Sequence, residues 1–361
     1  MSTTSDPYRM TGHKLHWHPD RVGHWLRGER IAPLHIELGI TNACQLDCHY
    51  CYGNLIGKAK PGSWLRFDLP REAIFRLFRE AKEVGVKSIT LVGEGENTLS
   101  SCFYDVAGYA REIGLDLGLA TNGLAFKTQK TVDLLRSFIW VRFSLGAATP
   151  ESYLRVHGRD RFDSAVKNIA ICVEEKRALG LPVTLGIQMV VIHDNIPEIV
   201  PLAKLARILG VDYFVAKPCS QSPDQRLDVR PEEYLELEDY FQGAEALSQG
   251  DFRVIVKREK FGNLGHNDFR TCYGTAFTIA IDSHGDVVPC GHLLSRKRDF
   301  VMGNILGQSF RDVVVSDRYW EVQAKVQSLD VTKACETNCL HHDMNRYLEM
   351  LLDPPQHINF P

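Results

Sequence analysis

Three cysteines lie close together in the segment Cys44-Gln45-Leu46-Asp47-Cys48-His49-Tyr50-Cys51, at the spacing C-x3-C-x2-C. Three thiolates on one loop can hold three irons of a [4Fe–4S] cluster, which leaves the fourth iron without a protein ligand. Such an open iron is useful when a substrate or cofactor binds to it. The alternative is a zinc site with His49 as the fourth ligand, but zinc sites usually contain two separated Cys/His pairs.

A second set of cysteines lies in the last third of the chain. A predicted β-hairpin over residues 275–288 has a thiol at each end, and two more thiols follow at the spacing C-x3-C. Four thiols suit tetrahedral zinc or a second [4Fe–4S] cluster without an open iron, and we favour the cluster. The four residues are Cys272, Cys290, Cys335 and Cys339.

Composition narrows the class of protein. The chain has 361 residues, of which 44% are hydrophobic, and its net charge is −3, without a long basic run. We therefore expect no nucleic acid partner. No apolar stretch approaches the ~20 residues of a membrane span, and the polar N-terminus lacks the apolar centre of a secretion signal. We expect a cytoplasmic protein, in which ten cysteines indicate metal binding more than disulfides.

The elements that must position these cysteines follow from hydrophobic periodicity. The predicted strands are residues 35–40, 87–92, 116–120, 140–144, 183–191 and 213–217, and the predicted helices are 71–84, 103–113, 128–138, 162–179 and 197–209. Such an alternation favours parallel strands with helical crossovers. Eight units would need about 250 residues. We therefore predict an α/β fold, a partial (β/α)6 barrel of TIM type, followed by a small α+β domain that contains the hairpin.

The first cysteine loop, with aromatic Tyr50 before its last cysteine, resembles the signature of radical S-adenosylmethionine (SAM) enzymes. The second set resembles their twitch domain, the short form of the SPASM domain, because no cysteine follows Cys339. In that family the open iron binds the methionine part of SAM, and an electron from the cluster splits SAM into a 5′-deoxyadenosyl radical. The resemblance implies two [4Fe–4S] clusters, SAM and an external electron donor of the flavodoxin or ferredoxin type.

The resemblance also divides the chain. We expect an N-terminal lead-in over residues 1–33 and the radical SAM partial barrel over 34–219. We expect three further parts: a bridge over 220–262, the twitch domain over 263–345, and a C-terminal helix and tail over 346–361.

Several segments at predicted strand ends resemble cofactor-binding segments of the family. Residues 93–97, Gly-Glu-Gly-Glu-Asn, are similar to its Gly-Gly-Glu-Pro segment, with Glu94 in place of a glycine and Asn97 in place of proline. Residues 121–123 match a recurrent Thr-Asn-Gly, although this is also a good turn sequence, and residues 144–147 resemble Ser-Leu-Asp-Ala. The residues predicted to bind the cofactor are Tyr50, Gly93, Glu94, Gly95, Glu96, Asn97, Asn122, Ser144, Arg155, His157, Arg159 and Gln188. Among these, Arg155, His157 and Arg159 are alternatives for a cation that faces the methionine carboxylate.

The sixth predicted strand ends at Lys217-Pro218-Cys219, where substrate contacts are expected. A lysine is costly to bury without a partner, so an inward Lys217 suggests an anionic or hydroxylated ligand. The thiol of Cys219 could return a hydrogen atom to a substrate radical. We predict Lys217 and Cys219 as catalytic residues.

Two functions are considered. The resemblance to twitch enzymes of aminoglycoside and saccharide pathways implies a small polyhydroxylated substrate. It would be oxidised through the auxiliary cluster or epimerised through Cys219. The alternative is modification of a peptide or protein. We expect the small molecule, because the 33 residues before the first predicted strand are too few for a peptide-binding domain.

Overall fold

The computed structural model describes residues 8, 13–59, 65–219, 236–262, 267–335 and 339–360. In these residues one ten-stranded sheet runs through both halves of the molecule, in the order β10-β9-β8-β1-β2-β3-β4-β5-β6-β7. The strands are β1 (His35–Leu38), β2 (Ser88–Leu91), β3 (Asp116–Thr121), β4 (Trp140–Ser144), β5 (Thr184–Val191), β6 (Tyr213–Pro218), β7 (Arg253–Val256), β8 (Thr278–Ile281), β9 (Asp286–Val288) and β10 (Gly303–Asn304).

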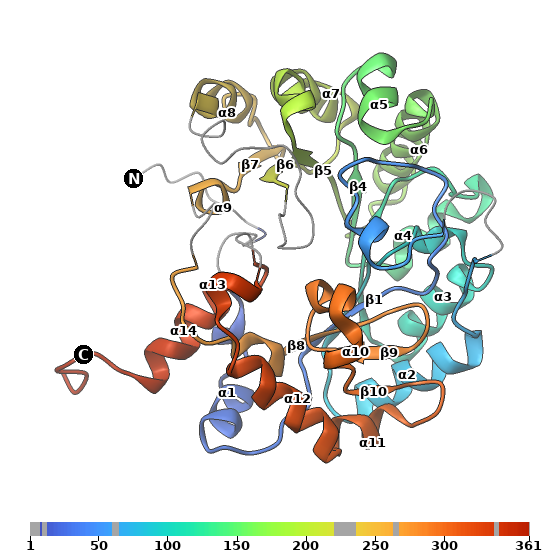
Figure 1. The fold of residues 1–361 in the computed structure, drawn as a ribbon. Coiled ribbons are helices and arrows are strands. Elements are labelled where there is room, and N and C mark those ends of the chain that lie inside the picture. Colours follow the sequence, from blue (N-terminus) through green and yellow to red (C-terminus); the bar gives the residue numbers. More distant parts are fainter. Residues whose placement is uncertain are drawn as a thin grey trace.

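Strands β1 to β6 are parallel, and helices cover their outer face (Figure 1). These helices are α2 (Arg71–Glu83), α3 (Phe103–Ile113), α4 (Thr131–Ser137), α6 (Phe162–Leu179) and α7 (Ile199–Leu209). The predicted barrel strands and helices are all present, with ends that differ by a few residues at most. The predicted α/β partial barrel is therefore confirmed.

Side chains along the barrel strands alternate between two environments, as a period of two requires. On β4, Val141 and Phe143 are buried in the core that the helices also form, whereas Arg142 and Ser144 are only partly buried and face the barrel interior. The polar residues of the barrel strands thus line the interior.

The sheet extends beyond the predicted barrel on both sides. Strand β7, from the predicted bridge, pairs in parallel with β6, and β8 of the predicted hairpin pairs in parallel with β1. The hairpin itself is confirmed, because β8 and β9 are antiparallel. A strand edge with unpaired backbone groups favours a further strand, so the cysteine-bearing hairpin shares a sheet with the barrel.

Helix α5 (Pro150–His157) was not predicted. Thr149 forms a capping box with Ser152, Pro150 occupies the first turn, and Gly158 ends the helix at φ 70°. These are standard helix start and stop signals. The short helix carries His157 toward the first cysteine loop.

The remaining helices lie in the lower half of Figure 1, apart from α8 and α9, which lie near β7 in the upper half. They are α1 (Pro19–Leu26), α8 (Glu238–Glu245), α9 (Arg258–Gly262), α10 (Lys297–Phe300), α11 (Phe310–Val315), α12 (Asp317–Gln327), α13 (Val331–Ala334) and α14 (His342–Leu352). The acidic segment over residues 231–247 itself predicts a helix; α8 lies within it, and residues 231–235 lie outside the described residues.

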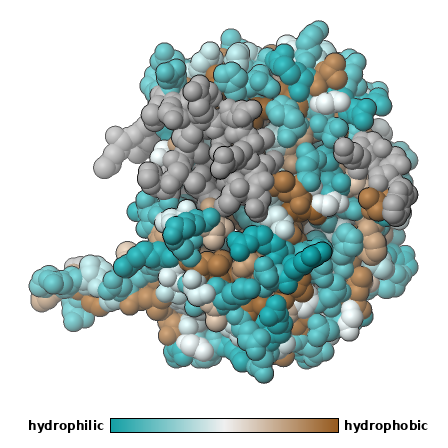
Figure 2. All heavy atoms as spheres, viewed as in Figure 1, coloured by the Kyte–Doolittle hydropathy of each residue, from teal (hydrophilic) through white to brown (hydrophobic). Residues whose placement is uncertain are grey.

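The C-terminal segment projects from the body of the molecule. Helix α14 leads into this projection, where Figure 2 shows hydrophobic side chains at the surface. Met350, Leu352, Ile358 and Phe360 are exposed there. Of the described helices, none combines the length and hydrophobicity needed to cross a membrane.

Candidate cluster and cofactor site

The first cysteine loop follows β1 and lies against the loop after β2. A Cβ atom on Gly95 would lie 2.4 Å from the carbonyl oxygen of Thr41 and 2.6 Å from that of Ala43. The backbone N–H of Glu96 donates to the same Ala43 carbonyl at 2.7 Å. Only glycine permits this approach. The glycine-containing segment therefore supports the loop that carries the cysteines.

Glu96 connects the loop after β2 to the loop after β3. Its Oε1 accepts hydrogen bonds from the hydroxyls of Thr98 and Thr121, each at 2.7 Å, and its Oε2 accepts the Asn122 backbone N–H at 2.7 Å. The side chain is buried, and burial raises the pKa of the Glu96 carboxyl. Glu96 is thus occupied with protein donors and orients Asn122.

Two predicted amide residues lie at the cysteine loop. The Asn122 Nδ2 donates toward Cys44 Sγ at 3.9 Å, and its Oδ1 accepts from Gln45 Nε2 at 3.2 Å. The Asn97 Oδ1 accepts the Ile40 N–H at 2.7 Å, while its buried Nδ2 has no partner among the described residues. The Nδ2 of Asn97 is therefore free to donate to a ligand.

His157 contacts the cysteine loop directly. The Gly146 N–H donates to its Nε2 at 3.1 Å, so the ring carries its hydrogen on Nδ1, which lies 3.1 Å from Cys48 Sγ. Burial lowers the pKa of His157 to about 3. The lowered pKa favours the neutral ring, whose Nδ1–H can donate to Cys48 Sγ. Tyr50 lies beside it, with ring centroids 6.1 Å apart.

The other candidate cations differ in position. Arg155 and Arg159 are exposed, and Arg155 Nη2 is 3.5 Å from the Asp194 carbonyl oxygen. By contrast, the side chain of Lys58 is only 1% exposed and its Nζ is 3.6 Å from Asp47 Oδ1. The sequence around Lys58 gives no local signal of this burial.

The charge of Lys58 acts on the cysteine thiols. It lowers the pKa of Cys44, but burial has the larger effect and raises that pKa to about 12. Burial likewise raises the pKa of Cys48, and Lys58 opposes the shift. A coordinated thiol is deprotonated by its metal, and a buried ammonium then offsets part of the added negative charge.

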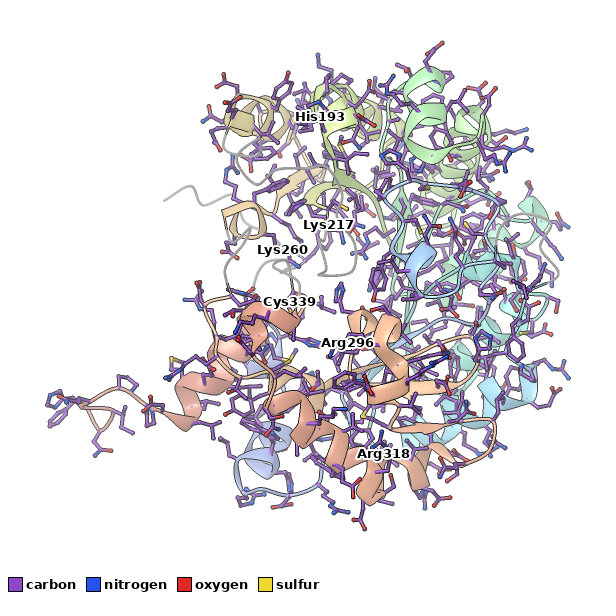
Figure 3. All side chains as sticks on the ribbon, in the orientation of Figure 1. His193, Lys217, Lys260, Arg296, Arg318 and Cys339 are labelled. Carbon is purple, nitrogen blue, oxygen red and sulfur yellow. The ribbon has the colours of Figure 1, made fainter. Side chains whose placement is uncertain are left out.

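The other predicted residues lie on or directly after β4, β5 and β6. Ser144 and Gln188 are register partners, as are Val190 and Lys217. Because they alternate with core residues, Ser144, Gln188 and Lys217 belong to the interior face. Cys219 follows β6, is buried, and donates its N–H to the Val191 carbonyl at 3.2 Å. In Figure 3 Lys217 is labelled near the middle of the view, between the two halves of the molecule.

The second cysteine set has its own N–H donors. Asn345 Nδ2 lies 3.6 Å from Cys272 Sγ, and the His341 backbone N–H lies 3.3 Å from Cys339 Sγ. The pKa of Cys290 is raised by burial first and then by the negative charges of Cys272 and Cys335. Cys272, Cys290 and Cys335 are therefore near enough to one another for their charges to interact.

Both sets suit an iron–sulfur cluster. The two sets supply three and four thiols, and a [4Fe–4S] cluster takes each thiolate on a different iron. N–H groups directed at sulfur also suit thiolate ligands. The donor sets are therefore suitable for iron–sulfur clusters.

Both the barrel and the C-terminal part of the chain match known families. Residues 38–206 match the Radical SAM superfamily, and residues 272–340 match SPASM, an iron–sulfur cluster-binding domain. These matches and SAM-bound structural neighbours indicate SAM and [4Fe–4S] clusters as cofactors.

Among curated relatives, the mycofactocin maturase MftC of Mycobacterium tuberculosis (strain CDC 1551 / Oshkosh) is 24% identical over 323 residues, 87% of this chain and 78% of the relative. A probable GTP 3′,8-cyclase of Saccharolobus islandicus is 26% identical over 194 residues, 54% of this chain and 57% of the relative. The first alignment must include parts of both matched domains.

Among solved structures, Streptococcus suis SuiB bound to its precursor peptide SuiA superposes with a TM-score of 0.66 and 18% identity, covering 98% of this chain and 80% of SuiB. SuiB bound to S-adenosylmethionine gives the same TM-score at 19% identity, covering 97% and 81%. These likenesses establish the shared fold.

Proposed function

Because the chain is a radical SAM enzyme with a SPASM-type auxiliary-cluster domain, we propose that it modifies a peptide or protein substrate. The observation that carries this proposal is the extent of the alignments. The maturase relative aligns over 87% of the chain, whereas the cyclase relative aligns over 54%. An alignment over 87% of the chain includes parts of both matched domains, so the combination of a barrel with an auxiliary domain is shared with a maturase.

The expected small polyhydroxylated substrate finds no support in these comparisons, nor does a role in carbohydrate biosynthesis. The alternative, peptide modification, fits them better. SuiB, whose fold this chain shares over nearly its whole length, was solved with a bound precursor peptide. We therefore place the peptide first and treat oxidation and cross-linking as its possible outcomes.

Radical SAM chemistry requires that SAM is bound at the first cluster and that the barrel interior accommodates the substrate. Bound at the open iron, SAM supplies the radical that removes a hydrogen atom from the substrate. The protein side chains hold the site: Glu96 orients Asn122, His157 donates to Cys48, and Lys58 offsets thiolate charge. Ser144 and Gln188, one register pair on the interior face, are proposed to contact SAM.

Substrate contacts are proposed deeper in the barrel and at the end of β6. Lys217 and Cys219 remain candidates there. Arg142, which the sequence analysis missed, also faces the interior, with its guanidinium 5.1 Å from the Trp140 ring centroid. Its Nε is buried without a hydrogen-bond partner among the described residues. A cation in that position suits a carboxylate of the substrate.

The test compares substrate classes directly. The anaerobically reconstituted enzyme is given SAM and dithionite with either peptides encoded by neighbouring genes or a panel of sugars and aminoglycosides. We expect only a peptide to increase 5′-deoxyadenosine formation and to change in mass. A sugar that is converted, while every peptide is returned unchanged, would overturn the proposal. A Cys44→Ala variant is the control for cluster-dependent turnover.

A further inference from the structure

A side chain beside the first cysteine set is bonded to the backbone beside the second set. Tyr52 follows Cys51 directly, and Gly291 follows Cys290 directly. The Tyr52 hydroxyl lies 2.9 Å from the Gly291 carbonyl oxygen and 2.7 Å from that of His292, and its single hydrogen is shared between them in a three-centre bond. The Tyr52 and His292 rings also meet edge to face, with centroids 5.2 Å apart.

The backbone is held firmly on the Tyr52 side of this contact. A Cβ on Gly53 would lie 2.4 Å from the Glu94 carbonyl oxygen, so the chain after Tyr52 is packed against the loop after β2. The Lys58 N–H donates to the Gly53 carbonyl at 2.8 Å. Since the peptide after Tyr52 has little freedom, a displacement of the Tyr52 side chain also displaces Cys51.

The backbone is also held on the other side. The Gly291 and His292 carbonyls belong to the 3-10 helix η8 (Gly291–Arg296), for which Cys290 is the N-cap residue. The Leu293 N–H donates to the Cys290 carbonyl at 3.1 Å. The Tyr52 hydroxyl therefore contacts the first turn of the helix that positions Cys290.

A second contact reaches the same hairpin. The Glu94 Oε1 accepts the Ser283 N–H at 2.8 Å, at the turn between β8 and β9. The hairpin is thus bonded to the barrel at its turn by Glu94, beside its cysteine by Tyr52, and along β8 by pairing with β1. Of these contacts, the one made by Tyr52 adjoins a cysteine of each set.

We propose that Tyr52 is a positioning residue that couples the two cysteine sets, so that a complete auxiliary site strengthens SAM binding at the first cluster. Such a coupling is reciprocal, because each site changes the affinity of the other by the same factor. The phenol hydroxyl is the coupling group, since a phenylalanine would fill the same space without a donor for the two carbonyls. The inference rests on the SAM and cluster chemistry of the proposed function and not on its peptide substrate.

A double-mutant cycle tests the coupling. The SAM dissociation constant is measured from the change in the first cluster's EPR spectrum, in the wild type, Tyr52→Phe, Cys290→Ala and the double variant. We expect Cys290→Ala to weaken SAM binding about fivefold or more in the wild-type background. In the Tyr52→Phe background it should have no further effect. An equal effect in both backgrounds, or none in either, would overturn the proposal.

Controls exclude a general loss of structure. Tyr109→Phe makes the same chemical change on α3, where Tyr109 stacks on Phe75 with centroids 4.3 Å apart, and should leave SAM affinity and coupling unchanged. If Cys290→Ala does not fold, the holoenzyme provides the test. SAM should then shift the EPR signal of the auxiliary cluster in the wild type but not in Tyr52→Phe, at equal iron content.

An identical SAM-induced shift in Tyr52→Phe and in the wild type would refute the coupling. Neither experiment contains a peptide or a sugar. A negative result therefore concerns Tyr52 alone and leaves the substrate class untouched.

Discussion

The imidazole of His157 and the thiol of Cys48, 109 positions apart in the chain, meet at 3.1 Å between Nδ1 and Sγ. The Gly146 N–H donates to Nε2 of the same ring. The ring hydrogen is therefore on Nδ1, where it points at the sulfur. Hydrogen bonds to ligand sulfurs are one of the means by which proteins set the reduction potential of a cluster. His157, the last residue of α5, is therefore a hydrogen-bond donor to a cysteine of the first cluster.

We expect His157→Phe to lower the reduction potential of the first cluster, because the reduced cluster carries more negative charge and loses a donor. The Gly146 N–H also loses its acceptor, which should reduce the free energy of unfolding by about 1–3 kcal/mol. An EPR-monitored redox titration measures the potential. Arg155→Ala, an exposed change on the same helix, is the control. An unaltered potential at full iron content would argue against this role.

Glu96→Gln should destabilise the protein and weaken SAM binding. Both carboxylate oxygens of Glu96 accept hydrogen bonds, and an amide NH2 in place of one oxygen would face a donor. The expected loss is about 1–3 kcal/mol of unfolding free energy, with weaker SAM binding because Asn122 is no longer held. Denaturant unfolding and SAM titration measure the two effects. Glu72→Gln, whose side chain is 75% exposed, should change neither.

The barrel could be predicted from the sequence because its signals are local. Helix α6 and strand β5 each show their period within one segment, and the spacing of Cys44, Cys48 and Cys51 lies within one loop. Helix α5 had adequate capping signals, but it is short and carries few apolar residues. Short elements of this kind are missed when periodicity is the main criterion.

The remaining features depend on contacts between distant residues. The pairing of β8 with β1 joins segments more than 200 positions apart, and no local pattern encodes it. Likewise, the burial of Lys58 and the contact of Tyr52 with Gly291 follow from how the loops pack. The burial of His157 against the Cys48 thiol also follows from the fold and has no local signal in the sequence.

Glu94 should make stability depend on pH. Its Oε1 accepts the Ser283 N–H, while its buried Oε2 has no partner among the described residues. Burial raises the pKa of Glu94, and the nearby Asp282 carboxylate, itself paired with Lys297 at 2.9 Å, adds to the shift. A folded-state pKa above the unfolded value means that the folded state binds the proton more tightly. Stability is then lost as pH rises through the folded pKa.

Glu94→Gln keeps an acceptor for Ser283 and removes the charge. We expect the variant to be more stable than the wild type at about pH 8, with a flatter dependence of unfolding free energy on pH. Urea unfolding over a series from about pH 6 to about pH 9 measures this. A variant that is less stable at the alkaline end would show instead that the folded protein stabilises the ionised carboxylate.

Asn345→Asp should reduce loading of the auxiliary cluster. Asn345 is fully buried on α14, where its Oδ1 accepts the Tyr273 and Gly274 N–H groups at 2.9 and 2.7 Å, and its Nδ2 faces Cys272 Sγ. Aspartate keeps the acceptor but places a carboxylate oxygen beside a thiolate, which disfavours the ligated state through like-charge repulsion.

We expect iron in Asn345→Asp to fall from about eight toward about four per chain, the content of a single [4Fe–4S] cluster. The SAM-induced change in the first cluster's EPR spectrum should persist at saturating SAM, because the cysteines of that loop are intact. Iron assay and Mössbauer spectroscopy after anaerobic reconstitution provide the measurement. Arg346→Ala, the exposed neighbour on the same helix, should retain all of its iron. Full loading of Asn345→Asp would show that the amide N–H does not support the Cys272 ligand.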